Sequence, residues 1–108
     1  MTDVFISYSR SDIALARLMQ KSLQAQGLNT WIDWEQIAVG DKWWLEIKEA
    51  IENANVFLFI ISRNSFNSQV CHDEVDHAIK NNKRIIPIIV DEFSPQELRE
   101  ISTSLPEY

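Results

Sequence analysis

Glycine and cysteine are scarce in this chain of 108 residues, and each scarcity excludes a class of site. The two glycines, Gly27 and Gly40, do not stand in a G-x-G-x-x-G or Walker pattern, so the sequence has no glycine-rich loop to hold phosphate groups. The single cysteine, Cys71, has no second cysteine with which to form a disulfide inside the chain. A standard nucleotide-binding loop and an internal disulfide framework are therefore excluded.

Long apolar runs and a surplus of positive charge are also missing. The longest apolar runs, residues 56–61 and 85–90, are far shorter than the roughly 20 residues that a membrane-spanning helix needs. Sixteen acidic residues against ten basic ones give a net charge of −6, which disfavours attraction to nucleic-acid phosphates. The first residues also lack the basic and apolar segments of a signal peptide. We therefore expect no membrane span, no direct nucleic-acid partner and a cytoplasmic location.

What is present is the composition of one globular domain. Hydrophobic residues make up 45% of the chain and charged residues 24%, which are ordinary values for a folded protein. Residues 3–8 form a β-branched and aromatic run that predicts a strand. Polar residues at 9–12 can cap a helix, and the helix predicted after them has Leu15, Met19 and Leu23 at helical spacing. Gly27 is well placed to end this helix in the left-handed conformation, and residues 28–32 resume an extended pattern.

Strands and helices continue to alternate along the chain. A second amphipathic helix is predicted from the apolar stripe of Trp43, Ile47, Ala50, Ile51 and Ala54. Residues 56–61 do not alternate between apolar and polar side chains, which predicts a strand buried on both faces. A third helix is expected to follow an N-cap at Ser68 and to have an apolar stripe made of Cys71, Val75, Ala78 and Ile79.

The last part of the chain predicts one more strand and one more helix. Residues 84–90 read as a fourth strand, in which Pro87 cannot donate a ladder hydrogen bond, so we expect a bulge or an unpaired position there. Ser94, Pro95 and Glu97 stand at the N-cap, N1 and N3 positions of a capping box, which predicts a short helix.

This order of elements predicts an α/β fold: a doubly wound, flavodoxin-like parallel sheet with helices on both faces. In such sheets ligands bind beyond the carboxyl ends of the strands. The loops at residues 7–12, 33–41, 62–69 and 91–94 are therefore the candidate site. A phospho-receiver domain of the same architecture requires an aspartate at the end of a strand, where this chain has Ser62, so that alternative fails.

The segment from residue 67 to 78, NSQVCHDEVDHA, gathers most of the reactive side chains. His72 and His77 are five residues apart and diverge on a helix, which disfavours a metal site. Cys71 lies on the apolar stripe, where a free cysteine is usually a small buried hydrophobe rather than a nucleophile. Glu74 lies on the flank of that stripe, at the ligand-binding end of the sheet, so it is the candidate functional acid. Asp73, Asp76 and His77 point away from the stripe, so we expect them to face solvent. Its alternative role is to stabilise the helix N-terminus by charge.

Four segments together resemble the Toll/interleukin-1 receptor (TIR) domain family, in particular its bacterial members. They are DVFISYSRSD, WIDWEQIAVGD, AIENANVFLFIISRNSFNSQVCHDE and KRIIPIIVDEF, and they span residues 3–93 in the family's order. The resemblance implies one TIR domain over residues 1–108, with a short helix and tail at 94–108. It also implies that the family's last strand and helix would follow Tyr108, so we expect the chain to be part of a longer protein.

The resemblance implies an enzymatic function. Many members cleave NAD⁺ into nicotinamide and ADP-ribose or a cyclic product, without a cofactor or metal, through a glutamate in an S-x-x-C-x-x-E-like motif. That motif reads here as Ser68, Cys71 and Glu74, which makes Glu74 the expected catalytic residue. The residues expected to bind NAD⁺ are Phe5, Ser7, Tyr8, Arg10, Asp33, Trp34 and Cys71.

The resemblance also implies an alternative function as a non-catalytic module that associates with other TIR domains in signalling or defence. The expected contact is the loop at residues 33–41, with Trp34, Ile37, Val39 and Gly40. The two functions can coexist, because the family's active site is often completed by a neighbouring protomer. This chain departs from the pattern of active members at Val70, where they often carry tryptophan, at Ala38, where some carry an acid, and at Ser9, where some carry arginine.

Overall fold

A parallel sheet forms the centre of the molecule. The structure is a computed structural model that describes residues 2–32 and 41–105. Its strands are β1 (Thr2–Ser7), β2 (Thr30–Trp31), β3 (Ala54–Ile61) and β4 (Arg84–Ile89). They pair in the order β2-β1-β3-β4, and every pair is parallel. This arrangement confirms the predicted α/β sheet and puts the carboxyl ends of β1 and β3 side by side.

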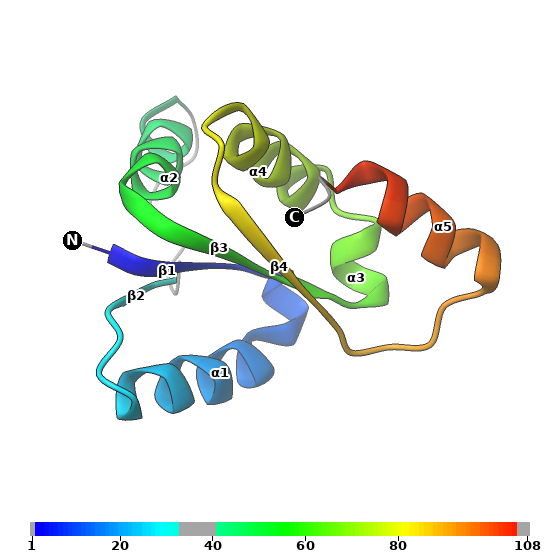
Figure 1. The fold of residues 1–108 in the computed structure, drawn as a ribbon, viewed down its shortest axis with the longest axis horizontal. Helices are drawn as coiled ribbons and strands as arrows, with labels where there is room; N and C mark the ends of the chain where they lie inside the picture. The colour runs from blue at the N-terminus through cyan, green and yellow to red at the C-terminus, as the bar shows by residue number, and fades with distance from the viewer. Residues whose placement is uncertain (1, 33–40, 106–108) are drawn as a thin grey trace.

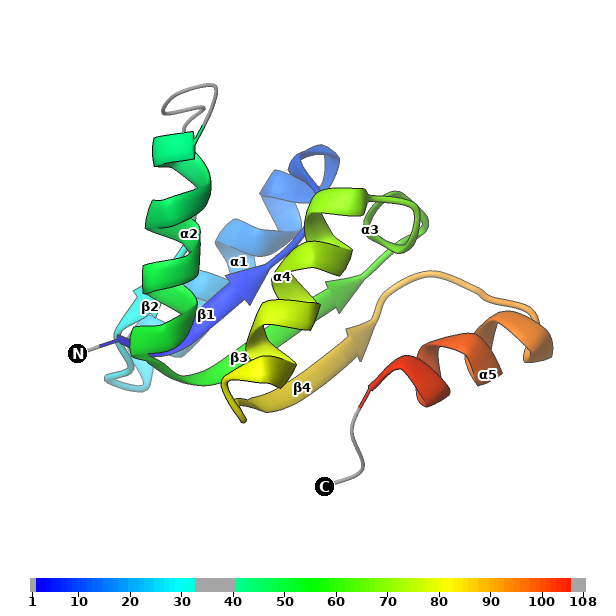
Figure 2. The same cartoon turned by 90° about the horizontal axis from the view of Figure 1, so that it is seen from above.

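Helices cover both faces of this sheet, as the alternation of elements predicted (Figure 1). Helix α1 (Ile13–Ala25), entered through the short 3₁₀ helix η1 (Arg10–Asp12), lies on one face. Helices α2 (Asp41–Asn53) and α4 (Gln69–Lys80) lie on the other, together with α3 (Arg63–Phe66) and α5 (Pro95–Ser104). Figure 2 shows α2 and α4 crossing the same face of the sheet. None of the helices in the described residues is long and apolar enough to cross a membrane.

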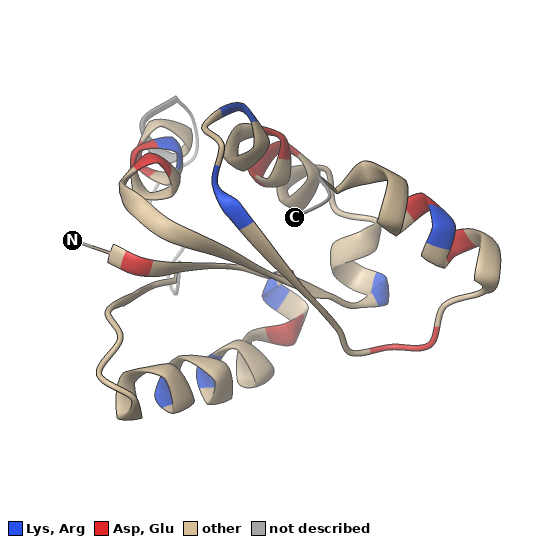
Figure 3. Ribbon diagram, viewed as in Figure 1, with Lys and Arg blue, Asp and Glu red and all other residues tan. Residues whose placement is uncertain are grey.

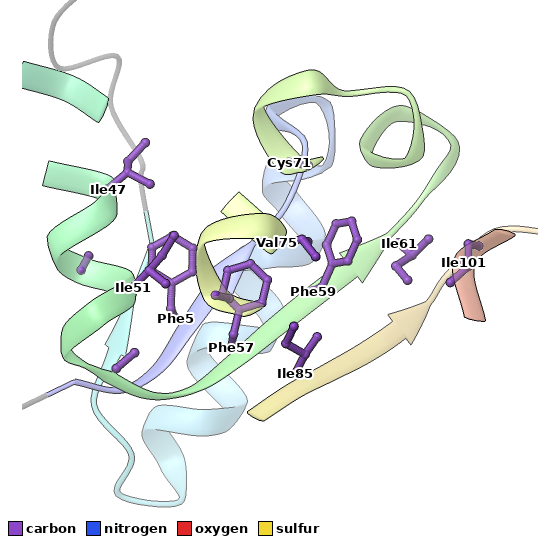
Figure 4. Close-up of a cluster of buried hydrophobic side chains, with 13 residues drawn as sticks. Phe5, Ile47, Ile51, Phe57, Phe59, Ile61, Cys71, Val75, Ile85 and Ile101 are labelled. Carbon is purple, nitrogen blue, oxygen red and sulfur yellow. The ribbon is translucent and has the colours of Figure 1, made fainter. Parts of the chain in front are cut away.

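Strand β3 divides the core into two clusters. It carries no charged residue, whereas most of the Lys, Arg, Asp and Glu residues lie on helices and loops (Figure 3). Its Phe57, Phe59 and Ile61 pack on the side of α2 and α4 (Figure 4). Leu58 and Ile60 pack on the side of α1. The strand is therefore buried on both faces, as the lack of alternation predicted.

Three element boundaries differ from the sequence-based prediction. Strand β2 comprises only Thr30–Trp31, although residues 28–32 read as extended. Ala54 begins β3 and does not end the second helix. The loop expected after β3 contains the short helix α3, because Ser62 and Ser65 form a reciprocal capping box in which each side chain accepts a backbone N–H of the other.

The expected bulge at Pro87 is wrong. The pairing of β3 with β4 runs without interruption from Val56 with Arg84 to Ile61 with Ile89, and Pro87 is aligned with Phe59. The proline is tolerated because β4 is the edge strand of the described sheet, where a missing N–H can face outward.

The predicted helix ends at Ser68, Ser94 and Gly27 are confirmed. The Ser68 side chain accepts the backbone N–H of Cys71 at the start of α4. Ser94 and Glu97 form the expected capping box of α5, with proline in its first turn. Gly27 has a φ of 83° after α1, a left-handed conformation that favours glycine.

Candidate active site at the carboxyl end of the sheet

A buried carboxylate lies against the end of the central strand β1. Glu74, in the second turn of α4, is only 7% exposed. The Ser7 hydroxyl donates a hydrogen bond of 2.7 Å to Glu74 Oε1. Ser7 is the last residue of β1, it is 1% exposed, and its backbone is in register with Phe59 of β3. The sheet therefore fixes the position of the carboxylate, and Glu74 is more deeply buried than its place on the flank of the helix stripe suggested.

Cys71, one helical turn before Glu74, is a buried thiol. It is 1% exposed and packs among the apolar side chains of the α2 and α4 face (Figure 4). Its pKa is raised from 9.0 to about 11, chiefly by burial. Hydrogen bonds with the Ser68 and Ser7 hydroxyls lower the pKa, the negative charges of Glu74 and Asp12 raise it, and about 11 is the net result. The thiol stays protonated near neutral pH, so Cys71 is the inert buried side chain that the apolar stripe predicted.

A second polar pair stands at the end of the neighbouring strand. The Ser62 hydroxyl, at the carboxyl end of β3, donates a hydrogen bond of 2.5 Å to Asp12 Oδ2. Sequence reasoning treated Ser9 and Asp12 as helix caps, but neither makes a side-chain cap hydrogen bond in the described structure. Asp12 and Ser62 were missed as a pair because they are 50 residues apart. The available signal was their location, since Ser62 directly follows β3 and Asp12 lies in the segment between β1 and α1, and the carboxyl ends of β1 and β3 meet.

Three of the residues that the family resemblance assigned to substrate binding differ in burial and surroundings. Phe5 is 1% exposed, and its ring stacks with Trp31 at 4.9 Å and with Phe57 at 5.3 Å, so its described contacts are within the core. Tyr8 is 9% exposed and packs in the cluster on the α1 face. Arg10 is exposed in η1. The structure thus brings together Ser7, Cys71 and Glu74 of the expected residues.

The remaining expected positions lie outside the described residues. They are Asp33 and Trp34, expected to bind NAD⁺, and Ile37, Val39 and Gly40, expected with Trp34 to mediate self-association. The role of the loop that contains them remains a prediction.

The other polar residues of α4 have partners of their own. Asp76 is exposed, as expected, and Asp73 is half-buried and accepts a hydrogen bond from Gln69. The expectation that His77 faces solvent is wrong, because its ring is 2.7 Å from Glu52 Oε2 on α2 and meets the Trp44 ring edge-on.

The two histidines of α4 have separate surroundings. His72 lies 2.6 Å from the Phe66 carbonyl oxygen, at the other end of the helix from the contact of His77 with α2. Among the residues that the structure describes, no group of three or more histidine, cysteine or acidic side chains is arranged to hold a metal ion.

Comparison with proteins of known function gives one curated relative. The NAD(+) hydrolase sarm1 of Drosophila melanogaster is 30% identical to this chain over 116 residues. The aligned region covers 93% of this chain and 8% of that protein, so the chain spans a small part of the relative's length.

Comparison with solved structures finds the same fold in three settings. The TIR domain of the Toll-related receptor TRR-2 from Hydra magnipapillata has a TM-score of 0.77 at 23% identity, covering 94% of this chain and 81% of that one. The TIR domains of the activated Roq1 resistosome, which recognises the pathogen effector XopQ, have a TM-score of 0.75 at 22% identity, and the match covers 93% of this chain and 63% of that one. A TIR-STING receptor from C. gigas has a TM-score of 0.70 at 22% identity, and the match covers 92% of this chain and 35% of that one. At these identities the likeness shows the fold.

The comparison with protein families agrees with the fold and extends over nearly the whole chain. The family model described as the TIR domain matches residues 4–105, which include most of β1, the whole of β2, β3 and β4, and the residues around Glu74. This chain therefore belongs to the TIR domain family.

Proposed function

We propose that this TIR domain cleaves NAD⁺ to release nicotinamide, with Glu74 as the essential carboxylate. The observation that carries the proposal is the burial of Glu74 at the carboxyl end of the sheet, where Ser7 donates to its Oε1 atom. This is the end at which doubly wound sheets bind ligands. The similarity to a relative named as an NAD(+) hydrolase supports the same reaction class.

The chemistry requires a fixed negative charge. When the bond between nicotinamide and ribose breaks, its electron pair leaves with the nicotinamide, which becomes neutral, and the ribose carbon gains positive charge. A carboxylate beside that carbon stabilises the transition state, as in glycoside hydrolysis. Water then attacks the carbon and loses a proton to give ADP-ribose, or a group of the ADP-ribose moiety attacks and gives a cyclic product.

Glu74 suits this role better than the other acids of its helix. Its carboxylate is held by a hydrogen bond from a strand that is itself fixed on both sides by β2 and β3. Asp76 is exposed to water, which would weaken its electrostatic effect on a bound substrate. Buried and oriented charges act more strongly because they need no reorganisation during the reaction.

The proposal includes activity that depends on assembly. A solved structure with the same fold belongs to a resistosome that contains several TIR domains. We infer that this chain also associates with other TIR domains, through residues 33–41, and that the assembled form is the active one. The alternative is a domain that associates in the same way without catalysing a reaction.

The direct test is to incubate the protein with NAD⁺ over a range of protein concentrations and to quantify free nicotinamide and ADP-ribose. We expect nicotinamide release to rise faster than linearly with protein concentration. A linear rise would overturn the assembly requirement and retain the enzyme. No release at any concentration, with oligomers visible in sedimentation, would overturn the enzyme and favour the non-catalytic module.

A further inference from the structure

The contact between Ser7 and Glu74 joins two elements that are far apart in sequence. The residues are separated by 67 positions, and the 2.7 Å distance links the end of the central strand β1 to the second turn of α4. Ser7 is 1% exposed and Glu74 is 7% exposed. Glu74 therefore keeps a small exposed fraction, whereas the Ser7 hydroxyl is enclosed and faces Glu74 inside the protein. This burial argues against the direct contact with NAD⁺ that was expected for Ser7.

The hydrogen bond has a consequence for the orientation of the carboxylate. A glutamate side chain has three rotatable bonds before its carboxylate, and fixing it has an entropic cost. A hydrogen bond from a hydroxyl to a charged oxygen is among the stronger ones in proteins. The donor here is placed by a strand in register with β3 at Phe59, so it has little freedom of its own.

We propose that Ser7 is a positioning residue, which holds the Glu74 carboxylate in the orientation that stabilises the ribosyl cation; this inference rests on the proposed function. Ser7 acts through Glu74 and does not bind the substrate. Its removal therefore changes the rate of the chemical step and leaves substrate binding unchanged.

The first experiment measures kcat and KM for NAD⁺ in Ser7→Ala, Ser7→Thr and Ser104→Ala. Ser7→Ala should lower kcat about 10- to 100-fold with KM within about twofold of the parent, because one hydrogen bond to a charged group is lost. Ser7→Thr retains a hydroxyl and should recover most of the rate. Ser104 is the control, since it lies at the end of α5 and its hydroxyl donates to the Ile101 carbonyl at 2.9 Å. Ser104→Ala removes one serine hydroxyl hydrogen bond outside the candidate site and should leave kcat within about threefold.

A second experiment combines Ser7→Ala with Glu74→Gln. Positioning predicts that Ser7→Ala has no further effect on kcat once the carboxylate is gone, since the two changes remove one function. A raised KM with unchanged kcat in Ser7→Ala would overturn the inference and make Ser7 a substrate contact. Independent losses of kcat in the double variant would also overturn it.

The inference remains testable if the parent protein does not cleave NAD⁺. In that case the proposed function fails, and urea unfolding of the parent, both single variants and the double variant decides whether Ser7 holds Glu74. If the two substitutions change the free energy of unfolding in a coupled way, the hydrogen bond from Ser7 positions Glu74. Additive changes would overturn the inference.

Discussion

At the scale of residues, the candidate site is made of single buried polar side chains on α4 and at the end of β1. Glu74 and Cys71 lie one helical turn apart on α4, and both are turned toward the sheet. Their neighbours differ in kind, because Glu74 receives a hydroxyl hydrogen bond whereas Cys71 packs mainly among apolar side chains. The same helix face thus combines a stabilised carboxylate with a protonated thiol.

The first prediction at the scale of residues concerns the reactivity of Cys71. Its pKa is raised from 9.0 to about 11, mainly by burial, with Glu74 adding to the rise. Near pH 8, iodoacetamide should alkylate the folded protein at least about 100-fold more slowly than the urea-unfolded chain, because the thiolate fraction falls tenfold per pH unit of pKa shift. Glu74→Gln should speed the folded reaction, since a negative charge near the thiol is lost. Equal rates in folded and unfolded protein would show that Cys71 is accessible and unperturbed.

The same raised pKa sets a limit on stability at high pH. The folded protein holds the thiol proton more tightly than the unfolded chain does, so the protonated thiol contributes to the free energy of unfolding. This contribution is fully present below pH 9.0. It is lost as the pH rises toward about 11.

At this scale the sequence predicted the burial of Cys71 and the location of Glu74 at the border of the core, because helical periodicity places both on or beside the apolar stripe. It did not predict that Ser7 faces Glu74 or that Ser62 binds Asp12. Periodicity identifies the face of one helix, whereas these contacts depend on how distant elements pack.

At the scale of elements, Arg63 connects α3 to the start of α5. Its guanidinium forms an ion pair with Glu97, donates to the Glu92 carbonyl at 2.6 Å and lies 4.6 Å from the centre of the Phe93 ring. Helix α5 has one buried side chain, Ile101, so its apolar anchorage is small. The polar contacts of Arg63 therefore contribute to holding α5 in place.

The prediction for this element is that Arg63→Met loosens α5 and leaves α4 unchanged. Amide hydrogen exchange should become faster over residues 95–104, because the contacts to Glu97, Glu92 and Phe93 are lost. Arg99→Met is the matched control, because Arg99 is an exposed arginine on α5 itself. Unchanged exchange in Arg63→Met would contradict the role of Arg63.

Acid should loosen the same element in the parent protein. The pKa of Glu97 is lowered from 4.5 to about 2, chiefly by the hydrogen bond from Arg63 and then by its bond to the Ser94 backbone. A lowered pKa stabilises the folded state above the unfolded value, so the protection of α5 should be complete above pH 4.5. It should be lost as the pH falls through about 2.

The sequence predicted α5 and α4 well, because a serine N-cap marks the start of each. It missed α3, in which serine replaces the usual acidic partner of the capping box. It also predicted a bulge at Pro87 that does not occur, because the sequence does not reveal which strand lies at the edge.

At the scale of the whole molecule, the edge of the sheet that β4 forms has exposed apolar side chains. Strand β4 lies at the edge of the described sheet, and Ile86 and Ile89 on it are 39% and 48% exposed. An exposed apolar edge strand can pair with another chain, so we expect unspecific aggregation of this protein to begin at β4.

The prediction for the whole molecule is that Ile89→Lys reduces aggregation of the chain at high concentration without unfolding it. A lysine on an edge strand disfavours pairing with a second strand. Leu18→Lys is the matched control, since Leu18 is 63% exposed but lies on α1, away from the edge. Light scattering over a concentration series measures the effect. An equal reduction by both lysines would attribute the effect to net charge and not to the strand edge.

The rate of nicotinamide release by Glu74→Gln tests most directly whether Glu74 is the essential carboxylate. The parent protein and Asp76→Asn are measured at the same protein concentration for comparison. Glutamine keeps the shape of the side chain and removes its charge, so we expect a rate about 10²–10³ lower than that of the parent. Asp76 is an exposed acid on the same helix, and Asp76→Asn should stay within a few-fold of the parent. Release of nicotinamide by Glu74→Gln at the parental rate would contradict the role of Glu74 as the essential carboxylate.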